Sequence, residues 1–150
     1  MLKGIDPVLT PELLKVMMEM GHDDAIVLAD ANFTAVRYAN GKPLIRLPGI
    51  GMARAVAAVT SLMPLVADER HPVGYMHVSG QPQGYRSALQ REVLETLEAG
   101  FLQGQTAEAI ERYAFYERTA SAFAIVLTGE LQPFGNFLLR KGVIGDNLRP

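Results

Sequence analysis

The segment Ala25-Ile26-Val27-Leu28-Ala29 decides the fold, because it is a continuous apolar run between two charged residues, Asp24 and Asp30. A run of this length predicts a β-strand that is buried on both faces. A sheet built from such strands needs helices on both of its sides. We therefore expect a layered α/β domain around a central sheet.

A helix is predicted directly upstream of this strand. Thr10-Pro11-Glu12 is a typical helix start, because threonine caps free amides, proline needs no donor in the first turn, and a carboxylate suits the positive end of the helix. Gly21 supplies the stop. The apolar residues between them share one helical face: Leu13, Leu14, Met17 and Met20.

The rest of the chain repeats this alternation of helices and apolar strands. Strands are predicted at 44–47, 73–78, 122–127 and 137–139, and helices at 52–62, 85–99 and 106–118, the last capped by Thr106. A chain of 150 residues has the usual size of one domain. We expect a single three-layer domain over residues 1–150, with a mostly parallel or mixed sheet covered by helices.

The composition excludes several classes of function. The net charge of −2 provides no basic surface for a nucleic acid, and the absence of cysteine rules out disulfides and thiolate chemistry. Charges at Lys3 and Asp6 argue against a signal peptide, and the uncharged run 55–67 is shorter than the roughly 18 residues of a membrane span. We expect a cytoplasmic protein without nucleic-acid or membrane partners.

Polar residues flank the buried strand 25–29. His22 precedes it, and a histidine can donate and accept a proton near neutral pH, which makes it the acid-base candidate. Asp30 follows it, at the end where ligands collect in open α/β sheets, and could bind sugar hydroxyls. The alternatives are a solvated loop histidine and a turn cap. A divalent ion bound by His22, Asp23, Asp24 and Asp30 is a further hypothesis without metal-specific spacing.

Two later segments carry further candidates. On the predicted helix 106–118, Arg112 could clamp a hydroxyl-rich ligand or form an exposed ion pair with Glu108. Phe134-Gly135-Asn136 combines an aromatic face, backbone amides and a side-chain amide, which suits sugar binding, although a simple turn also fits. No glycine-rich nucleotide motif or Gly-x-Ser-x-Gly elbow is present, so neither a nucleotide cofactor nor serine-hydrolase chemistry is expected.

Several motifs in order resemble the L-fucose mutarotase / D-ribose pyranase family, most closely its fucose mutarotase branch. The resemblance covers almost the whole chain, from Met1 to about Val143. The motifs that carry it are Met1-Leu2-Lys3-Gly4-Ile5-Asp6-Pro7, Pro11-Glu12-Leu13-Leu14-Lys15, Met20-Gly21-His22, Ala29-Asp30-Ala31-Asn32-Phe33, Glu111-Arg112-Tyr113-Ala114-Phe115-Tyr116-Glu117-Arg118 and Gly135-Asn136.

The resemblance implies a mutarotase that interconverts the α and β anomers of a free aldose, with L-fucose as the expected substrate, and that uses neither metal nor cofactor. By matching motifs, His22 is expected to be the acid-base residue, and Asp30, Arg112, Phe134, Gly135 and Asn136 are expected to bind the sugar. The family also implies a homo-oligomeric ring, commonly a decamer, with sites near subunit interfaces. His22 and Arg112 therefore need not meet within one chain.

Two departures from the family pattern bear on the substrate. Phe134 stands where tyrosine is common, which removes a phenolic hydrogen bond but keeps an aromatic face, and Asp23 stands where glycine is usual. The alternatives to an L-fucose mutarotase are a pyranase acting on D-ribose-type sugars and a non-catalytic monosaccharide-binding protein.

Overall fold

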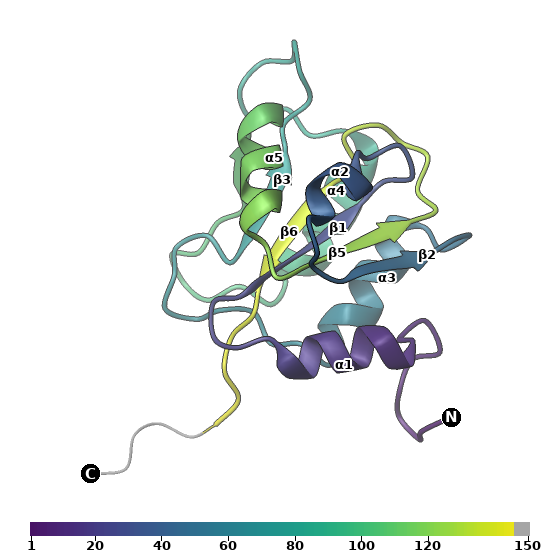
Figure 1. Ribbon diagram of the computed structural model, residues 1–150. Coiled ribbons are helices and arrows are strands. Elements are labelled where there is room, and N and C mark those ends of the chain that lie inside the picture. The colour runs from purple at the N-terminus through teal and green to yellow at the C-terminus, as the bar shows by residue number, and fades with distance from the viewer. Residues whose placement is uncertain (146–150) are drawn as a thin grey trace.

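The computed structural model of the protein describes residues 1–145, so the last five residues of the predicted domain lie outside the described range. Within it, six strands form one sheet in the order β2-β5-β1-β6-β3-β4 (Figure 1). Only β6 is antiparallel to its neighbours, β1 and β3. The strands are β1 (Ala25–Ala29), β2 (Leu44–Leu47), β3 (Val73–Met76), β4 (Glu108–Ile110), β5 (Ala124–Thr128) and β6 (Phe137–Arg140). The predicted α/β class with a mixed sheet is confirmed.

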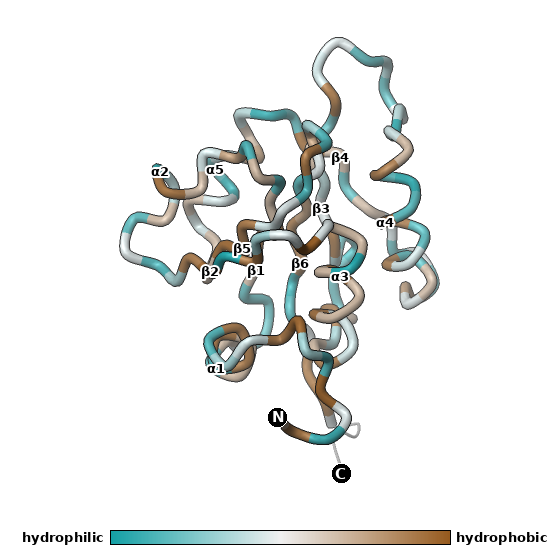
Figure 2. The backbone as a smooth tube through the Cα atoms, turned by 90° about the vertical axis from the view of Figure 1, so that its right-hand side faces the viewer, coloured by the Kyte–Doolittle hydropathy of each residue, from teal (hydrophilic) through white to brown (hydrophobic). Residues whose placement is uncertain are grey.

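Helices cover both faces of the sheet. The described residues form α1 (Pro11–Glu19), α2 (Ala35–Ala39), α3 (Met52–Thr60), α4 (Ala88–Glu98) and α5 (Arg112–Ser121). The helices α3 and α4 lie on one side of the sheet and α2 and α5 on the other (Figure 2), and α1 packs into the same core as α3 and α4. The predicted three layers are confirmed. None of the helices described is long and apolar enough to cross a bilayer.

The strand β1 is buried on both faces, as its apolar run predicts. Ile26 and Leu28 belong to the core under α1, α3 and α4, whereas Val27 and Ala29 belong to the core under α2 and α5. All four side chains are fully buried. Since side chains alternate along a strand, one short segment supplies both cores.

Local signals placed several elements correctly. The Thr10 hydroxyl accepts a hydrogen bond from the Leu13 amide at 3.2 Å, and α1 begins at Pro11 as predicted. The helix α4 begins at Ala88 rather than at Tyr85, because Ser87 and Gln90 form a reciprocal capping box. The short helix α2 was not predicted from the sequence.

The predicted helix 106–118 is wrong in its first half. Residues 108–110 form β4, which pairs with β3, and Glu111 rather than Thr106 caps α5 by accepting the amides of Tyr113 and Ala114. The proposed ion pair between Glu108 and Arg112 is therefore also wrong, and Glu108 instead binds Arg118 at 3.2 Å. Pairing with a strand that is remote in sequence overrides the local helical pattern here.

The strand directions define two edges of the sheet. Because β1 to β5 are parallel to one another, their carboxyl ends meet at one edge, which we call the carboxyl edge, and β6 begins there. The opposite edge, where β1 to β5 begin and β6 ends, is the amino edge. Every polar candidate from the sequence lies at one of these edges.

Candidate functional site

A buried pair of side chains joins β1 to β6 at the carboxyl edge. The backbone amide of Asp30 donates to Asn136 Oδ1, and Asn136 Nδ2 donates to Asp30 Oδ2, both at 2.9 Å. Each residue is only 3% exposed. The two residues are 106 positions apart in the sequence, so the tertiary fold brings these two predicted site residues together.

The Asp30 carboxyl group lies in an unfavourable environment for a charge. Burial raises its pKa above the ordinary value, and the negative charge of Glu130 adds to this rise. Hydrogen bonds from the Asn32 amide and the Asn136 side chain act in the opposite direction. Since a carboxylate can accept about four hydrogen bonds, Asp30 keeps acceptor capacity for a ligand hydroxyl.

The segment before β6 has a backbone that is locally strained. Phe134 adopts a φ of 61°, a left-handed conformation that is rare for a bulky residue. A Cβ atom on Gly135 would lie 2.8 Å from Leu89 Cδ2 and 3.0 Å from the Gln132 carbonyl oxygen, so a larger residue would require these neighbours to shift. The Phe134 side chain packs against the core under α2 and α5. This segment therefore has one defined shape at the carboxyl edge.

Gln90, which the sequence analysis did not select, holds this segment in place. It is fully buried, and its Nε2 donates to the carbonyls of Met76 at 2.7 Å and Phe134 at 3.0 Å. Its Oε1 accepts the amide of Ser87. The spacing Ser87-x-x-Gln90 is a capping-box signal and could have placed Gln90 at the helix start, but it carries no information about Phe134.

Arg112 is the first residue of α5 and lies directly after β4 at the carboxyl edge. Its guanidinium group lies 4.6 Å from the centre of the Tyr113 ring, and Nη2 donates to the Tyr113 hydroxyl at 2.6 Å. Its Nε is buried without a hydrogen-bond partner among the residues described. A buried donor of this kind is costly unless a ligand satisfies it.

The carboxyl edge thus gathers Asp30, Arg112 and the segment 134–136. The strands β1 and β4 are separated by β6 and β3, a distance of about 14 Å at the usual strand spacing. Among the described residues, no hydrogen bond or ion pair joins Arg112 to Asp30 or Asn136. A ligand between them would meet acceptors on one side and a cation on the other.

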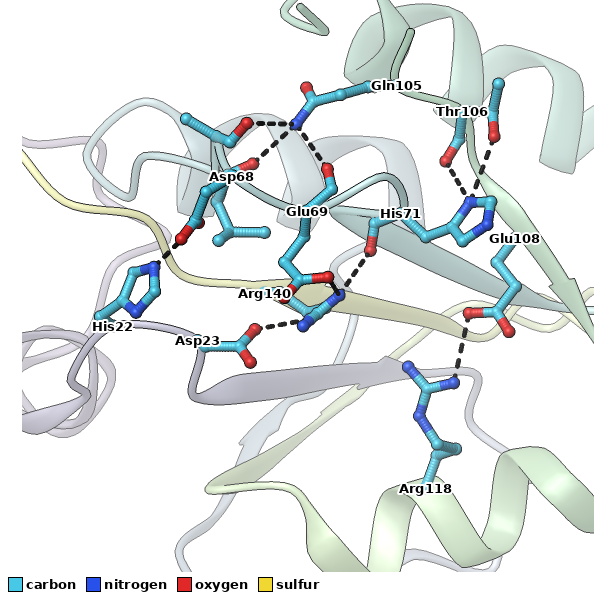
Figure 3. A network of polar contacts seen from close by, with 12 residues as sticks. His22, Asp23, Asp68, Glu69, His71, Gln105, Thr106, Glu108, Arg118 and Arg140 are labelled. Carbon is cyan, nitrogen blue, oxygen red and sulfur yellow. Dashed lines mark hydrogen bonds and ion pairs between the residues drawn. The ribbon is translucent and has the colours of Figure 1, made fainter.

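His22 lies at the amino edge and not with the other candidates. It precedes β1, whose five residues span about 17 Å, whereas Asp30 follows the same strand. The His22 Nε2 lies 3.0 Å from Asp68 Oδ1 (Figure 3). One chain therefore cannot bring His22 and Asp30 to one ligand, and the ion site hypothesised for both residues does not fit a single chain. No metal-binding group of three His, Asp or Glu side chains occurs within residues 1–145.

Comparison with known proteins identifies the family. A model of the RbsD / FucU transport protein family matches residues 3–144. The chain belongs to this family. The family resemblance inferred from the motifs is thereby confirmed.

Members of the RbsD / FucU family that resemble this chain are similar over almost their whole length. The L-fucose mutarotase of Glaesserella parasuis is 41% identical, covering 95% of this chain and 96% of that protein. The human fucose mutarotase is 40% identical, and the similarity covers 97% of this chain and 96% of that protein.

Solved structures of the RbsD / FucU family share the fold. The fucose mutarotase from Streptococcus pneumoniae, solved in complex with L-fucose, has a TM-score of 0.85 and 36% identity, covering 96% of this chain and all of that chain. The RbsD of Bacillus subtilis, complexed with D-ribose, has a TM-score of 0.71 and 26% identity, covering 97% of this chain and all of that one. The chain is more similar to the fucose mutarotase than to the RbsD protein.

Gln90→Met tests whether Gln90 supports the site segment. Methionine fills a similar volume but leaves the carbonyls of Met76 and Phe134 without their donor, so we expect a loss of about 1 to 3 kcal/mol in the free energy of unfolding. Urea titration measures this loss. The control Gln83→Met changes an exposed glutamine and should stay within about 0.5 kcal/mol of the parent. Equal stability of the two variants would contradict the supporting role of Gln90.

Proposed function

We propose that the protein is an aldose mutarotase whose substrate is L-fucose. The observation that carries this proposal is the carboxyl edge, where a buried carboxyl group, a side-chain amide and a guanidinium group whose Nε has no partner among the described residues lie at the same edge of the sheet. Such a set of donors and acceptors suits a ligand that is uncharged and rich in hydroxyl groups. The similarity to proteins named fucose mutarotase favours L-fucose among such ligands.

The reaction requires two proton movements and no oxidant or cofactor. The anomeric hydroxyl loses a proton while the ring oxygen gains one, the bond between C1 and the ring oxygen breaks, and an open-chain aldehyde forms. Rotation about the bond from C1 to C2 exposes the other face of the aldehyde, and closure reverses the proton movements. His22 can take and return the proton, with water or a second group serving the other oxygen.

The position of His22 requires a second copy of the chain in the site. If His22 acts on a sugar held by Asp30 and Arg112, it must come from a neighbour whose amino edge meets this carboxyl edge. Such a contact is heterologous, and repeated heterologous contacts form a ring when the rotation from one copy to the next closes. The proposed assembly is therefore a ring. Two such rings, stacked on each other, would give the decamer expected from the family resemblance.

Exposed apolar residues support a contact between the amino edge of one chain and the carboxyl edge of its neighbour. An apolar groove of about 350 Å³ lies beside His22 at the amino edge, between α1, the end of α3 and the segment after β6. Large exposed apolar side chains include Met18, Leu62, Val143 and Ile144 around this groove, and Tyr85, Tyr113 and Leu131 in the segments at the carboxyl edge. Contiguous exposed apolar surface is typical of protein interfaces.

Two alternatives remain as hypotheses. The structural similarity to an RbsD protein complexed with D-ribose favours the pyranase, and Phe134, which lacks a phenolic hydroxyl, favours a sugar-binding protein without rapid catalysis. Saturation-transfer NMR on a panel of aldoses separates them, because it reports anomer and ring-form exchange directly. Action in the cytoplasm stays a prediction.

His22→Gln tests the acid-base assignment. Glutamine is polar and of similar reach but cannot cycle a proton near neutral pH, so we expect anomer exchange to fall by roughly two orders of magnitude or more. Sugar binding should weaken less, because His22 acts on the proton rather than on affinity. Saturation-transfer NMR measures the exchange. A folded variant with a rate within about twofold of the parent would show that the proton moves through another group.

Asp30→Asn and Arg112→Ala test the sugar-binding assignment. Each removes a charge-assisted hydrogen bond, so we expect a loss of about 1.5 to 3 kcal/mol in binding free energy, measured by titration calorimetry with L-fucose. The matched control is Arg37→Ala, which removes an exposed arginine that lies 5.7 Å from the Tyr38 ring in a similar stacked arrangement. Parental affinity in folded Asp30→Asn or Arg112→Ala would refute the role of that residue.

Mixing two impaired variants, assayed at a sugar concentration too low to saturate Arg112→Ala, tests the shared site. His22→Gln and Arg112→Ala chains that are dissociated and reassembled together should regain up to about a quarter of the parental exchange rate, since a random ring pairs an intact His22 with an intact Arg112 at one contact in four. Native mass spectrometry verifies that mixed rings form. Mixed rings that are no more active than the separate variants, or light scattering that shows a stable monomer at micromolar concentration, would contradict the shared site.

A further inference from the structure

His22 forms a pair with Asp68 at the amino edge. The distance from His22 Nε2 to Asp68 Oδ1 is 3.0 Å, with the two side chains 46% and 67% exposed. An exposed pair of this kind contributes little to stability, because two mobile side chains lose freedom when they meet. A pair that persists at such a site therefore depends on how firmly its two loops are held.

Arg140, at the end of β6, ties the two loops together. Its Nε binds Asp23 at 2.6 Å and its Nη1 lies 3.5 Å from Glu69, so it contacts the sequence neighbours of both members of the pair. Figure 3 shows the Arg140 guanidinium group between these two carboxylates. The Arg140 side chain is only 17% exposed, and Nη1 also donates to the His71 carbonyl at 3.2 Å. Charge-assisted bonds in such a half-buried place are stronger than those on open surface.

The loop that carries His22 is held by its own backbone as well. The Gly21 amide donates to Asp24 Oδ2 at 2.7 Å, and the Asp23 amide donates to the Lys141 carbonyl at 2.8 Å. Asp23 adopts a φ of 66°, a conformation that favours glycine, yet its carboxylate supplies the partner for Arg140. The side chain at this position therefore offsets a strained backbone with an ion pair.

The loop that carries Asp68 is held by Gln105. The Gln105 Nε2 donates to the carbonyls of Val66 and Glu69 at 2.9 Å each, and lies 3.3 Å from the Ala67 carbonyl (Figure 3). These carbonyls lie on both sides of Asp68 in the sequence. Its position is thus set by contacts that do not involve His22.

We propose that Asp68 is a positioning residue for His22. The Asp68 carboxylate accepts the hydrogen bond from Nε2–H, which orients the imidazole ring and leaves Nδ1 to exchange the proton with the sugar. This inference rests on the proposed function. Nδ1 has no hydrogen-bond partner within the part of the chain that the structure describes. When Nδ1 takes the anomeric proton, the ring becomes an imidazolium cation, and the adjacent carboxylate stabilises that charge.

The charge of Asp68 suits this role. The hydrogen bond with His22 lowers the pKa of the Asp68 carboxyl group, with a smaller contribution from the positive charge of Arg140. The carboxyl group is therefore ionised throughout the neutral pH range. It can act on the imidazole ring without itself releasing or binding a proton in the reaction.

A series at position 68 tests the proposal. Asp68→Ala should lower kcat for anomer exchange about tenfold, which is part of the 10²- to 10⁴-fold that general acid-base catalysis supplies. KM should stay within about twofold of the parent, because in this proposal Asp68 does not touch the sugar. Asp68→Asn should lose less, since its amide oxygen still accepts but carries no charge. Asp68→Glu should recover most of the rate. Glu19→Gln, an exposed carboxylate on α1 bound to Lys15, is the charge-matched control and should keep the parental kcat.

A second measurement tests the contact independently of activity. NMR titration of the Asp68 carboxyl group should show a pKa below the ordinary range in the parent and a rise toward that range in His22→Ala, because the variant removes the first cause of the lowering. An unchanged Asp68 titration in His22→Ala would show that the pair does not form in solution, and would overturn the proposal.

The outcomes separate this inference from the proposed function. If His22→Gln loses exchange but Asp68→Ala keeps kcat within about twofold of the parent, or changes KM alone, the positioning role is refuted and the acid-base role of His22 stands. If His22→Gln retains the parental rate, the acid-base role of His22 in the proposed function is itself refuted. Loss of kcat in Asp68→Ala with recovery in Asp68→Glu supports the positioning role.

Discussion

The burial of β1 on both faces is the constraint on which the rest of the molecule depends. Its residues 26–29 fill two cores at once, and neither face of β1 carries a polar side chain. The polar side chains proposed for catalysis and sugar binding therefore lie at the two edges, which are about 17 Å apart along the strand. This separation places the proposed proton-transfer residue and the proposed sugar-binding residues on opposite sides of one chain.

The strand β6 links both edges because it runs antiparallel to its neighbours. Its start carries Asn136, which binds Asp30 at the carboxyl edge, and its end carries Arg140, which ties the loops of His22 and Asp68 at the amino edge. A parallel strand in this position would place the preceding loop at the other edge and separate Phe134 from Asp30. The direction of one strand thus organises both halves of the proposed site.

The two edges also carry local costs that a purely structural domain would avoid. At the carboxyl edge a buried carboxyl group, a left-handed phenylalanine and an unpaired arginine Nε lie in neighbouring segments. Gln90 donates hydrogen bonds to the carbonyls of Met76 and Phe134 and so holds the strained segment in place, which offsets part of this cost. Such clusters of strain and unpaired polar groups mark sites of function, where a ligand or partner supplies what the fold leaves unsatisfied.

The sequence by itself determined the features that depend on neighbouring residues. The apolar run 25–29 was sufficient to predict a doubly buried strand, Thr10-Pro11 predicted the start of α1, and the alternation of elements predicted three layers, because burial patterns and caps act over a few residues. The motifs that resemble the family also selected the residues that the structure brings together at the carboxyl edge, Asp30, Arg112 and 134–136.

Only the tertiary structure decided what depends on contacts between remote segments. Residues 108–110 look helical from their neighbours but become β4 because β3 offers them hydrogen-bond partners. The antiparallel direction of β6, the role of Gln90 and the pairing of His22 with Asp68, 46 positions away, have no local signal. The placement of His22 and Asp30 on opposite edges follows from strand direction, since a strand that connects two loops also holds them apart.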